Sequence, residues 1–469
     1  MRSASRILGF ALSVCCSLAA DRGKLDWARL APETLEHYTA LIRLNTSNPP
    51  GNETRVATYL KQVLDRDGIP SRLYSLEPDR ANLVARLKGS GKKRPILLFA
   101  HTDVVGVQRE RWSVDPFAAL RKDGYVYGRG SIDDKDKLAA MLMVFLELKR
   151  SKTKLDRDVI LLAEAGEEGT PHAGIDYMVR EHWPEVEAEY ALTEGGGGVS
   201  RNGIVRYISI STTEKVPRRT RLVAHGMAGH GSIPRPDNAV VRLANAVSRI
   251  SAWQPPMRLN DTTRTYFERL ATISSPQDAE RYNHIADPSR TVDIQQYFAE
   301  HEFQHNSILR TSIVPTILNA GFKVNVIPSE GEAQLDIRAL PDENMERFYD
   351  QMRRVIQDPN VELVPDKPGR PVAPPSRLDT DMFRALENAQ RRLYPGAITL
   401  PSMLTGATDM AQLRARGVQA YGVGPVIDER DRDANGAHSD DERLQETAVN
   451  KLAEFLWSAV LEVAGAERQ

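Results

Sequence analysis

The chain has 469 residues, of which 41% are hydrophobic and 27% are charged, and its formal net charge at pH 7 is −1. A chain of this length and composition is expected to be globular, with a large core and more than one domain. The near-neutral net charge gives the protein no long-range basic or acidic field. We therefore expect neither nucleic acid nor an anionic membrane surface as a partner.

The N-terminal segment has the layout of a secretory signal peptide. Arg2 and Arg6 precede an apolar run that extends from Ile7 to about Ala20 and is followed by charged residues. A helix that spans a bilayer needs about 20 apolar residues, which is more than this run provides. We expect residues 1–20 to be a cleaved signal peptide and the protein to be secreted or periplasmic, with an uncleaved membrane anchor as the alternative.

The only cysteines of the chain, Cys15 and Cys16, lie inside this segment. After cleavage the mature protein would contain no cysteine and no disulfide. Catalysis by a cysteine nucleophile and metal binding by thiolates are then excluded.

Predicted helices and strands alternate after the signal segment, which is typical of an α/β protein. Residues 32–44 and 53–68 have apolar residues at helical spacing, and residues 135–152 form a strongly amphipathic helical pattern. Runs that are apolar on both faces predict buried strands. They occur at residues 95–103, 158–169 and 188–198. Each of these runs ends in polar residues, and α/β proteins place their sites at the carboxyl ends of such strands.

The pattern changes near residue 212, which indicates an inserted domain. Residues 250–312 are polar and mostly helical in pattern, and alternating strands resume at 322–328 and 331–340. A proline-rich segment, 366–377, then reads as a linker before the α/β pattern returns. The resulting prediction is a catalytic domain of residues 21–212 and 371–469, interrupted by an α+β lid or dimerisation domain of residues 213–370 with an enlarged helical insert at about 250–312.

Carboxylates and histidines gather at the ends of the predicted strands and in the polar loops. Each has an ordinary structural explanation, because a strand-end histidine is more often part of a core and a buried acid is usually just paired. Together they supply nitrogen and oxygen donors without thiolate, a set that suits zinc, with Mn²⁺ or Co²⁺ as substitutes. These residues are His101, Asp103, Asp133, Glu167, Glu168, Glu194 and His438.

The number of donors favours two metal ions rather than one. Two histidines and at least three carboxylates exceed the four ligands of one tetrahedral zinc. A bridging carboxylate would hold two cations about 3.5–4 Å apart, as in hydrolytic dinuclear sites. Glu167 lies next to Glu168, so one acid is available as a general base while the other binds metal.

The order of these motifs resembles peptidase family M20, which includes acetylornithine deacetylases, succinyl-diaminopimelate desuccinylases, aminoacylases and glutamate carboxypeptidases. The resemblance covers nearly the whole mature chain. It rests on HTD, WSVDPF, YGRGSIDDK, EAGEEG, TEGG, HGMAGHGSIP with PDNAV, NVIP with DIR, GATD and GAHSDDE. It implies a zinc-peptidase-like catalytic domain, with a mixed central sheet flanked by helices, and an inserted lid through which some relatives form homodimers.

Five residues match the metal ligands of this family. The resemblance implies that His101 and Glu194 are terminal ligands of one zinc, that Asp133 bridges both ions, and that Glu168 and His438 bind the second. The family often has glycine after DDK, where this chain has Asp136. In this residue and in its long helical insert, the chain resembles the carboxypeptidase S-like branch of the family.

Other matched positions imply roles in catalysis and substrate binding. Glu167 corresponds to the general base, and Asp103 to the aspartate that orients His101. His230 corresponds to a lid histidine that polarises the scissile carbonyl, often from the other subunit. Arg338 matches a position that holds the substrate carboxylate, although it also fits a sheet-surface arginine with a solvated head. Asn325 in NVIP matches a second position that holds the substrate carboxylate, and Gly406 in GATD is expected to contact the substrate.

The mechanism implied is metal-assisted hydrolysis of an amide bond, with Glu167 taking a proton from water and delivering it to the leaving amine. In this family a glutamate at position 194 goes with carboxypeptidases and deacylases. We therefore expect a small peptide or an N-acyl amino acid with a free α-carboxylate as substrate. The alternatives are an aminopeptidase or dipeptidase of the same family, and a catalytically inactive peptide-binding member.

The sequence leaves some polar residues with ordinary interpretations. Asp409 fits either a helix cap or a position near the substrate. Glu442 reads as a charge at a helix N-terminus. Asp134, Asp136 and Lys137 of the GRGSIDDKDK run (128–137) are expected to face solvent or a helix N-terminus.

Overall fold

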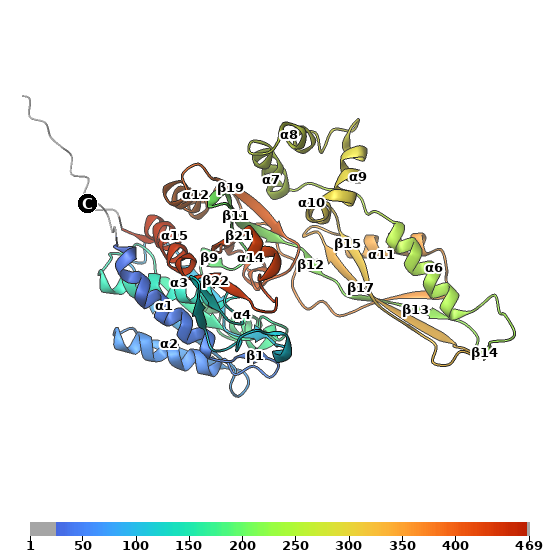
Figure 1. Ribbon diagram of the computed structural model, residues 1–469, viewed down its shortest axis with the longest axis horizontal. Helices are drawn as coiled ribbons and strands as arrows, with labels where there is room; N and C mark the ends of the chain where they lie inside the picture. The colour runs from blue at the N-terminus through green and yellow to red at the C-terminus, as the bar shows by residue number, and fades with distance from the viewer. Residues whose placement is uncertain (1–24, 467–469) are drawn as a thin grey trace, which may run out of the picture.

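The computed structural model describes residues 25–466, so the expected signal peptide and both cysteines lie outside the described residues. Two bodies are visible in Figure 1. A large α/β body contains both ends of the described chain, and a smaller body that projects from it contains the middle of the sequence. Within the described residues, no helix is long and apolar enough to cross a membrane.

The large body is built on a ten-stranded mixed sheet. Its strands lie in the order β2 (Ser71–Ser75), β3 (Ala81–Leu87), β8 (Val159–Glu164), β4 (Ile96–His101), β9 (Tyr190–Thr193), β20 (Gln419–Gly422), β11 (Ile204–Glu214), β10 (Gly197–Arg201) and β21 (Val426–Asp428), and β19 (Ile398–Leu404) also pairs with β11. The neighbours β8, β4, β9 and β20 are parallel. Their carboxyl ends therefore meet at one edge of the sheet.

Helices cover both faces of this sheet, which confirms the predicted α/β architecture. Leu98 and Leu161 pack into the core on one face, whereas their strand neighbours Phe99 and Leu162 pack into the core on the other. The first face carries α1 (Trp27–Arg43), α2 (Thr54–Arg66), α3 (Lys135–Arg150), α12 (Asp381–Leu393) and α15 (Glu446–Ala464). The second face carries α4 (Ile175–Glu181), α5 (Trp183–Val186) and α13 (Met410–Arg414).

The prediction that residues 135–152 form a strongly amphipathic helix is right about the helix but wrong about an exposed polar face. The helix exists as α3, but every residue from Lys135 to Leu148 is buried. The reason is its position, because α3 packs against β4 and β8 and is covered by α1 and α15. A helix enclosed on all sides loses the distinction between an apolar and a polar face.

The smaller body lies within residues 213–370, the range expected for the inserted lid domain, and the name lid is kept for it below. Its sheet has the order β12 (Val216–Pro217), β17 (Glu330–Ala339), β13 (Thr220–His225) and β18 (Val361–Pro365), and β15 (Ser312–Ala320) also pairs with β17. Helices α6 (Ala239–Ala252) and α11 (Met345–Ile356) pack on it around Leu335 and Phe348. A two-stranded ribbon of β14 (Gly229–His230) and β16 (Val326–Ile327) forms its far tip (Figure 1).

The helical insert forms a small core of its own. It consists of α7 (Asp261–Ala271), α8 (Pro276–Asn283), α9 (Thr291–His301) and α10 (Phe303–Ile308), packed around Phe267 and Phe298. The sequence placed this insert within the lid, but α7 packs against β19 of the large body. Arg269 also donates from Nη1 to Glu387 of α12 at 2.7 Å. The insert therefore contacts the sheet of the large body directly.

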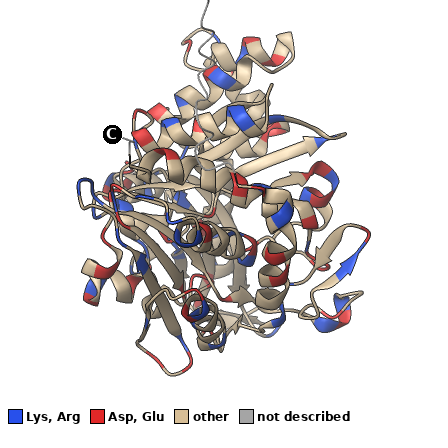
Figure 2. Cartoon of the chain, turned by 90° about the vertical axis from the view of Figure 1, so that its left-hand side faces the viewer, with Lys and Arg blue, Asp and Glu red and all other residues tan. Residues whose placement is uncertain are grey.

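Short elements complete the large body. They are β1 (Ser47–Asn48) paired with β5 (Val104–Val105), the sheet of β22 (Arg443–Gln445), β7 (Tyr125–Tyr127) and β6 (Leu120–Lys122), helix α14 (Glu429–Ala434), and the 3₁₀ turns η1 (Arg109–Arg111) and η2 (Pro171–Ala173). Figure 2 shows acidic and basic residues interspersed on the face of this body, in keeping with the near-neutral charge.

Candidate metal centre and active site

The predicted site residues of the large body converge where its parallel strands end. His101 is the last residue of β4, and Glu194 directly follows β9. Glu167 and Glu168 lie in the loop after β8, Asp133 in the loop before α3, and His438 in the loop before β22. Donor atoms within 4.8 Å of one another form three groups: His101, Asp133 and Glu194; Asp133, Glu168 and His438; and His101, Glu167 and Glu168.

Asp133 lies between the two histidines. Its Oδ1 is 2.8 Å from Nε2 of His101, and its Oδ2 is 3.1 Å from Nε2 of His438. Burial by itself would raise the pKa of Asp133, but its hydrogen bonds to the two histidines hold that pKa well below the ordinary value. One carboxylate thus presents its two oxygens to two different nitrogen donors, which is the arrangement required of a bridging ligand.

The two histidines are held as hydrogen-bond donors to carboxylates. His438 Nε2 is also 2.8 Å from Oε1 of Glu168. Hydrogen bonds to Asp133 and Glu168 raise the pKa of His438 to about 10. Burial alone would lower the pKa of His101, but hydrogen bonds to Asp103 and Asp133 raise it well above the ordinary value. In each of these histidine–carboxylate pairs a proton is shared between a nitrogen and an oxygen. A metal ion bound by the same two atoms would replace that proton.

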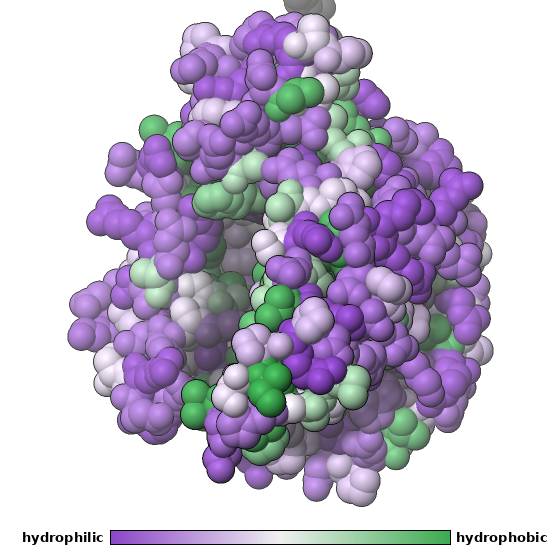
Figure 3. All heavy atoms as spheres, turned by 90° about the vertical axis from the view of Figure 1, so that its right-hand side faces the viewer, coloured by the Kyte–Doolittle hydropathy of each residue, from purple (hydrophilic) through white to green (hydrophobic). Residues whose placement is uncertain are grey.

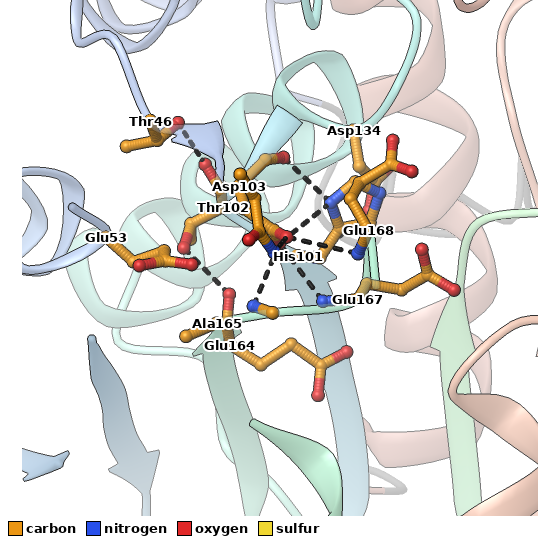
Figure 4. A network of polar contacts seen from close by, with 12 residues as sticks. Thr46, Glu53, His101, Thr102, Asp103, Asp134, Glu164, Ala165, Glu167 and Glu168 are labelled. Atoms are coloured by element: carbon orange, nitrogen blue, oxygen red, sulfur yellow. Dashed lines mark hydrogen bonds and ion pairs between the residues drawn. The ribbon is translucent and has the colours of Figure 1, made fainter. Parts of the chain in front are cut away.

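Asp103 organises the loop that carries the two glutamates (Figure 4). Its Oδ1 accepts hydrogen bonds from the backbone N–H groups of Gly166 and Glu167 at 3.0 and 3.1 Å, and its Oδ2 accepts one from Glu168 at 3.1 Å. The nearest acceptor of His101 Nδ1 is the backbone oxygen of Asp103, at 3.0 Å. Its carboxylate is farther from that nitrogen, at 3.5 Å. Asp103 therefore contacts His101 chiefly through its main chain and fixes the Glu167–Glu168 loop with its side chain.

The same loop depends on two glycines. Gly166 has φ +80°, a conformation that side chains with a Cβ rarely adopt. A Cβ on Gly174 would lie 1.8 Å from the backbone oxygen of Ala165, so the chain after the loop packs directly on its start. These constraints explain the glycine directly before the two acids and the glycine at the end of the loop.

Glu167 has a partner that sequence reasoning missed. Arg370 Nη2 donates to Glu167 Oε1 at 2.6 Å, and Arg370 Nη1 donates to Asp409 Oδ1 at 2.7 Å. Burial, with a smaller contribution from Asp409, raises the pKa of Glu167 to about 8. Burial likewise raises the pKa of Asp409 to about 6. No signal marked Arg370, since it lies in the segment that reads as a proline-rich linker.

Asp134, Asp136 and Lys137 lie at the N-terminus of α3, as one of the two expected positions had it, but the alternative that they face solvent is wrong. All three are buried, and Lys137 Nζ lies 2.8 Å from Asp134 Oδ1 and 3.0 Å from Asp136 Oδ1. They begin the buried helix α3, where charged side chains can only be accommodated by pairing. The lysine neutralises two acids beside Asp133.

Glu442 was set aside as a helix-end charge but is fully buried beside the site. Its Oε2 accepts a hydrogen bond from Arg129 at 2.5 Å, and its Oε1 accepts one from the backbone N–H of Ile132 at 2.7 Å. Arg129 also donates to the backbone oxygen of His438 at 3.3 Å. This pair ties the Asp133 loop to the His438 loop. Its closeness to His438 in GAHSDDE was the available signal.

The structure does not bring the predicted lid residues to the metal ligands of the same chain. His230 is exposed on β14 at the tip, hydrogen-bonded to Ser232 at 2.7 Å, and the backbone oxygen of Asn325 accepts from Gly231 nearby. Arg338 lies at the other end of the lid sheet, beside Pro217 of β12, and pairs with Asp336 at 2.8 Å. In the large body, Gly406 lies in the open loop between β19 and α13.

The residues present fit divalent metal ions. Carboxylate and imidazole donors are the ligands that zinc, manganese and cobalt accept, and three groups of such donors lie within reach of common points. Asp133 is the member whose two oxygens face different histidines, and this is the feature that favours a dinuclear arrangement over a single site.

Comparison with known proteins identifies the family of the chain. The sequence model described as Peptidase family M20/M25/M40 matches residues 97–462. N-fatty-acyl-amino acid synthase/hydrolase PM20D1 of Xenopus tropicalis is 29% identical over 373 residues, 77% of this chain and 71% of the relative. Aminoacylase-1 of Mus musculus is 27% identical over 416 residues, 87% and 90% of the two chains.

A solved structure shows the same fold. The M20 family metallo-carboxypeptidase Sso-CP2 from Sulfolobus solfataricus matches with a TM-score of 0.66 and 17% identity, covering 91% of this chain and 99% of that chain. The family match spans most of the sequence, from the strand that carries His101 to the last helix. The chain therefore belongs to peptidase family M20 and is a hydrolase of the peptidase or amidohydrolase type.

Proposed function

We propose that this protein is a dizinc hydrolase that releases an amino acid with a free α-carboxylate from an N-acyl amino acid or a small peptide. The observation that carries the proposal is the position of Asp133, whose two oxygens face His101 and His438. Glu194 and Glu168 complete the two donor groups. Co²⁺ and Mn²⁺ are expected to substitute for Zn²⁺, because they accept the same donors.

Metal ions held by these five residues would supply an acidified water and polarisation of the scissile carbonyl. Glu167 is placed to take a proton from the attacking water and to return it to the leaving amine. Its neighbour Glu168 is directed to His438, so the two adjacent acids have different tasks. Donation of a hydrogen bond by His230 to the developing oxyanion requires that this lid residue come from outside its own chain's site.

The proposed substrate class is supported by the names of two relatives and not by the shape of a pocket. One relative is named an N-fatty-acyl-amino acid synthase/hydrolase and another an aminoacylase. Both names describe an acyl group joined to an amino acid. Arg338, Asn325 and Gly406 remain our predicted contacts for the substrate carboxylate and backbone.

A substrate panel tests the proposal. The zinc-loaded protein is incubated with N-acyl amino acids, free-amino dipeptides and N-acyl amino acid amides, and amino-acid release is measured. Release from N-acyl amino acids but not from their C-terminal amides is expected, since only the former carry the free carboxylate. Cleavage confined to free-amino dipeptides would instead support the aminopeptidase or dipeptidase alternative. Stoichiometric metal without any turnover would favour the non-catalytic alternative.

The lid also supports a homodimer. Within the described part of the chain β15 pairs on one side only, with β17, and it exposes the apolar side chains of Val314, Ile317 and Leu318. Figure 3, which views the molecule from the right-hand side of Figure 1, shows apolar residues scattered among polar ones on that face. An open apolar strand edge is unfavourable in a monomer. A symmetric dimer would cover it and carry His230 toward a partner's metal centre.

We further propose that the protein is exported, on the basis of residues 1–20 alone. Mass determination of the secreted or periplasmic protein tests this, because cleavage after Ala19 or Ala20 leaves a mature N-terminus at residue 20 or 21.

A further inference from the structure

Arg370 lies on the return connection between the lid and the large body. The connection follows β18, which ends at Pro365, and precedes α12, which begins at Asp381. The backbone oxygen of Arg370 also accepts a hydrogen bond at 3.3 Å from Arg218, which follows β12 on the outgoing connection. Arg370 is thus anchored where both connections between the two bodies run together.

Its guanidinium spans two acids of the site. The two Nη atoms contact Glu167 and Asp409 at 2.6 and 2.7 Å, and the side chains of Arg370, Glu167 and Asp409 are only 13%, 12% and 1% exposed. Because the guanidinium is planar and rigid, two such contacts fix the separation and orientation of both carboxylates. Asp409 is buried, and among the described residues its Oδ2 has no hydrogen-bond partner. Arg370 is therefore the group that compensates its charge.

Glu167 is consequently held at two independent points. Asp103 fixes its backbone N–H, and Arg370 fixes Oε1 of its carboxylate. Among the described contacts Oε2 of Glu167 has no partner, so this oxygen is the one left to receive a proton. Both Nη atoms of Arg370 are already engaged by acids, which makes Arg370 a poor binder of a substrate carboxylate.

We propose that Arg370 is a positioning residue for Glu167, acting as a clamp that aims the free oxygen of that carboxylate, with Asp409 holding the other end of the guanidinium. This proposal rests on the proposed function, in which Glu167 is the base. The residue that would position the base therefore lies on the connection between the lid and the large body, outside the sequence motifs that carry the predicted site residues.

The test compares Arg370→Ala, Arg370→Lys and Asp409→Asn with the wild type on an N-acyl amino acid that the wild type cleaves. We expect Arg370→Ala to lower kcat by about 10- to 100-fold, because a small misplacement of a catalytic group has effects of this size. KM should change less than about threefold, and bound metal should stay at the wild-type level. Asp409→Asn should lower kcat less, and the double variant should be no worse than Arg370→Ala alone.

Rescue distinguishes positioning from loss of structure. Arg370→Lys keeps the charge without the fork, so it should recover only part of kcat, and added guanidinium ions should partly restore Arg370→Ala. Arg377→Ala is the matched control, because this arginine lies on the same connection but pairs with Asp379 at the exposed surface. It should leave kcat unchanged.

Three outcomes would overturn the proposal: an unchanged kcat in Arg370→Ala, a rise in KM with kcat intact, or a loss of metal that matches the loss of activity. A wild type that cleaves nothing in the panel would instead contradict the proposed function itself. Wild-type turnover is therefore measured first, and the ratio of variant to wild type is what tests Arg370.

Discussion

Nε2 of His438 lies 3.1 Å from Oδ2 of Asp133, although the two residues come from loops on either side of the inserted lid in the sequence. The contact joins the loop before α3 to the loop before β22. Asp133 also contacts His101 at the end of β4, so the three residues form one connected group of possible metal ligands.

Asp133→Asn should abolish binding of both metal ions, because an amide cannot present two anionic oxygens to two cations. Metal content after dialysis, measured by plasma mass spectrometry, checks this. Asp136→Asn is the matched control and should keep both ions, since Asp136 pairs with Lys137 and touches no predicted ligand. It should nevertheless lower the free energy of unfolding, by about 1–3 kcal/mol for a buried group that loses a charged partner. A full metal complement in Asp133→Asn would remove it as the bridge.

Metal binding should release protons, with an affinity that rises with pH. The pKa of His438 is about 10 in the metal-free fold and the ordinary value is 6.5, so His438 is protonated at pH 7 and must lose that proton to bind metal. His101, whose pKa is also raised, behaves likewise. Calorimetric titration in two buffers of different ionisation enthalpy counts the protons released, and we expect at least about two per chain at pH 7.

The raised pKa of His438 also determines how the stability of the metal-free protein depends on pH. A folded-state pKa above the unfolded one contributes stability to the metal-free protein that is fully present below pH 6.5 and is lost as the pH rises through about 10. His438→Gln should remove this part of the pH dependence. Titrations without proton release would show that the histidines bind metal from an already neutral state.

Glu167→Ala should retain metal and lose turnover by about 10²- to 10⁴-fold, the usual contribution of a general base. Both quantities are measured on the same preparation. Glu181→Ala, at an exposed position of α4 paired with Arg180, serves as the control and should behave as the wild type. Equal loss of metal and activity in Glu167→Ala would mean that the base and the ligand are assigned the wrong way round.

His230→Ala should spare metal binding and lower kcat, because the residue lies at the lid tip and not among the ligands of its own chain. Mixing His230→Ala chains with Glu167→Ala chains under exchange conditions tests whether it acts across a dimer. About a quarter of the wild-type activity should return, since half of the dimers are mixed and each mixed dimer has one complete site. Two inactive variants that stay inactive when mixed would place His230 within its own chain's site or outside catalysis.

Glu442→Ala should cost about 3–5 kcal/mol of unfolding free energy, because it leaves the buried Arg129 without its partner. Urea denaturation of the metal-free protein measures the loss without a contribution from bound ions. Glu446→Ala, four residues later, removes a partly exposed partner of Arg121 and should cost less than about 1 kcal/mol. Similar losses in the two variants would contradict the view that burial makes the Glu442 pair important.

Much of the fold was predictable because it follows from local pattern. The apolar runs ending at His101, Glu164 and Thr193 read as buried strands, and they are neighbouring parallel strands of one sheet. Exposure was less predictable, as α3 shows, because the number of sides on which a helix is covered depends on elements distant in the sequence. The insert was located by its polar composition, but its contact with β19 was not visible in that composition.

The sequence by itself determined the chemistry available at the site. It supplies imidazole and carboxylate donors at strand ends, no thiolate after the expected signal peptide, and two adjacent glutamates, one predicted as base and one as metal ligand. It also determined the family, because the motifs occur in a fixed order along the chain. The tertiary structure alone decided which charges face one another. Three charge pairings became visible only in the structure: Arg370 with Glu167, Glu442 with Arg129, and Lys137 with two acids. They matter because they are buried, and burial is a property of the whole packed fold rather than of any short segment.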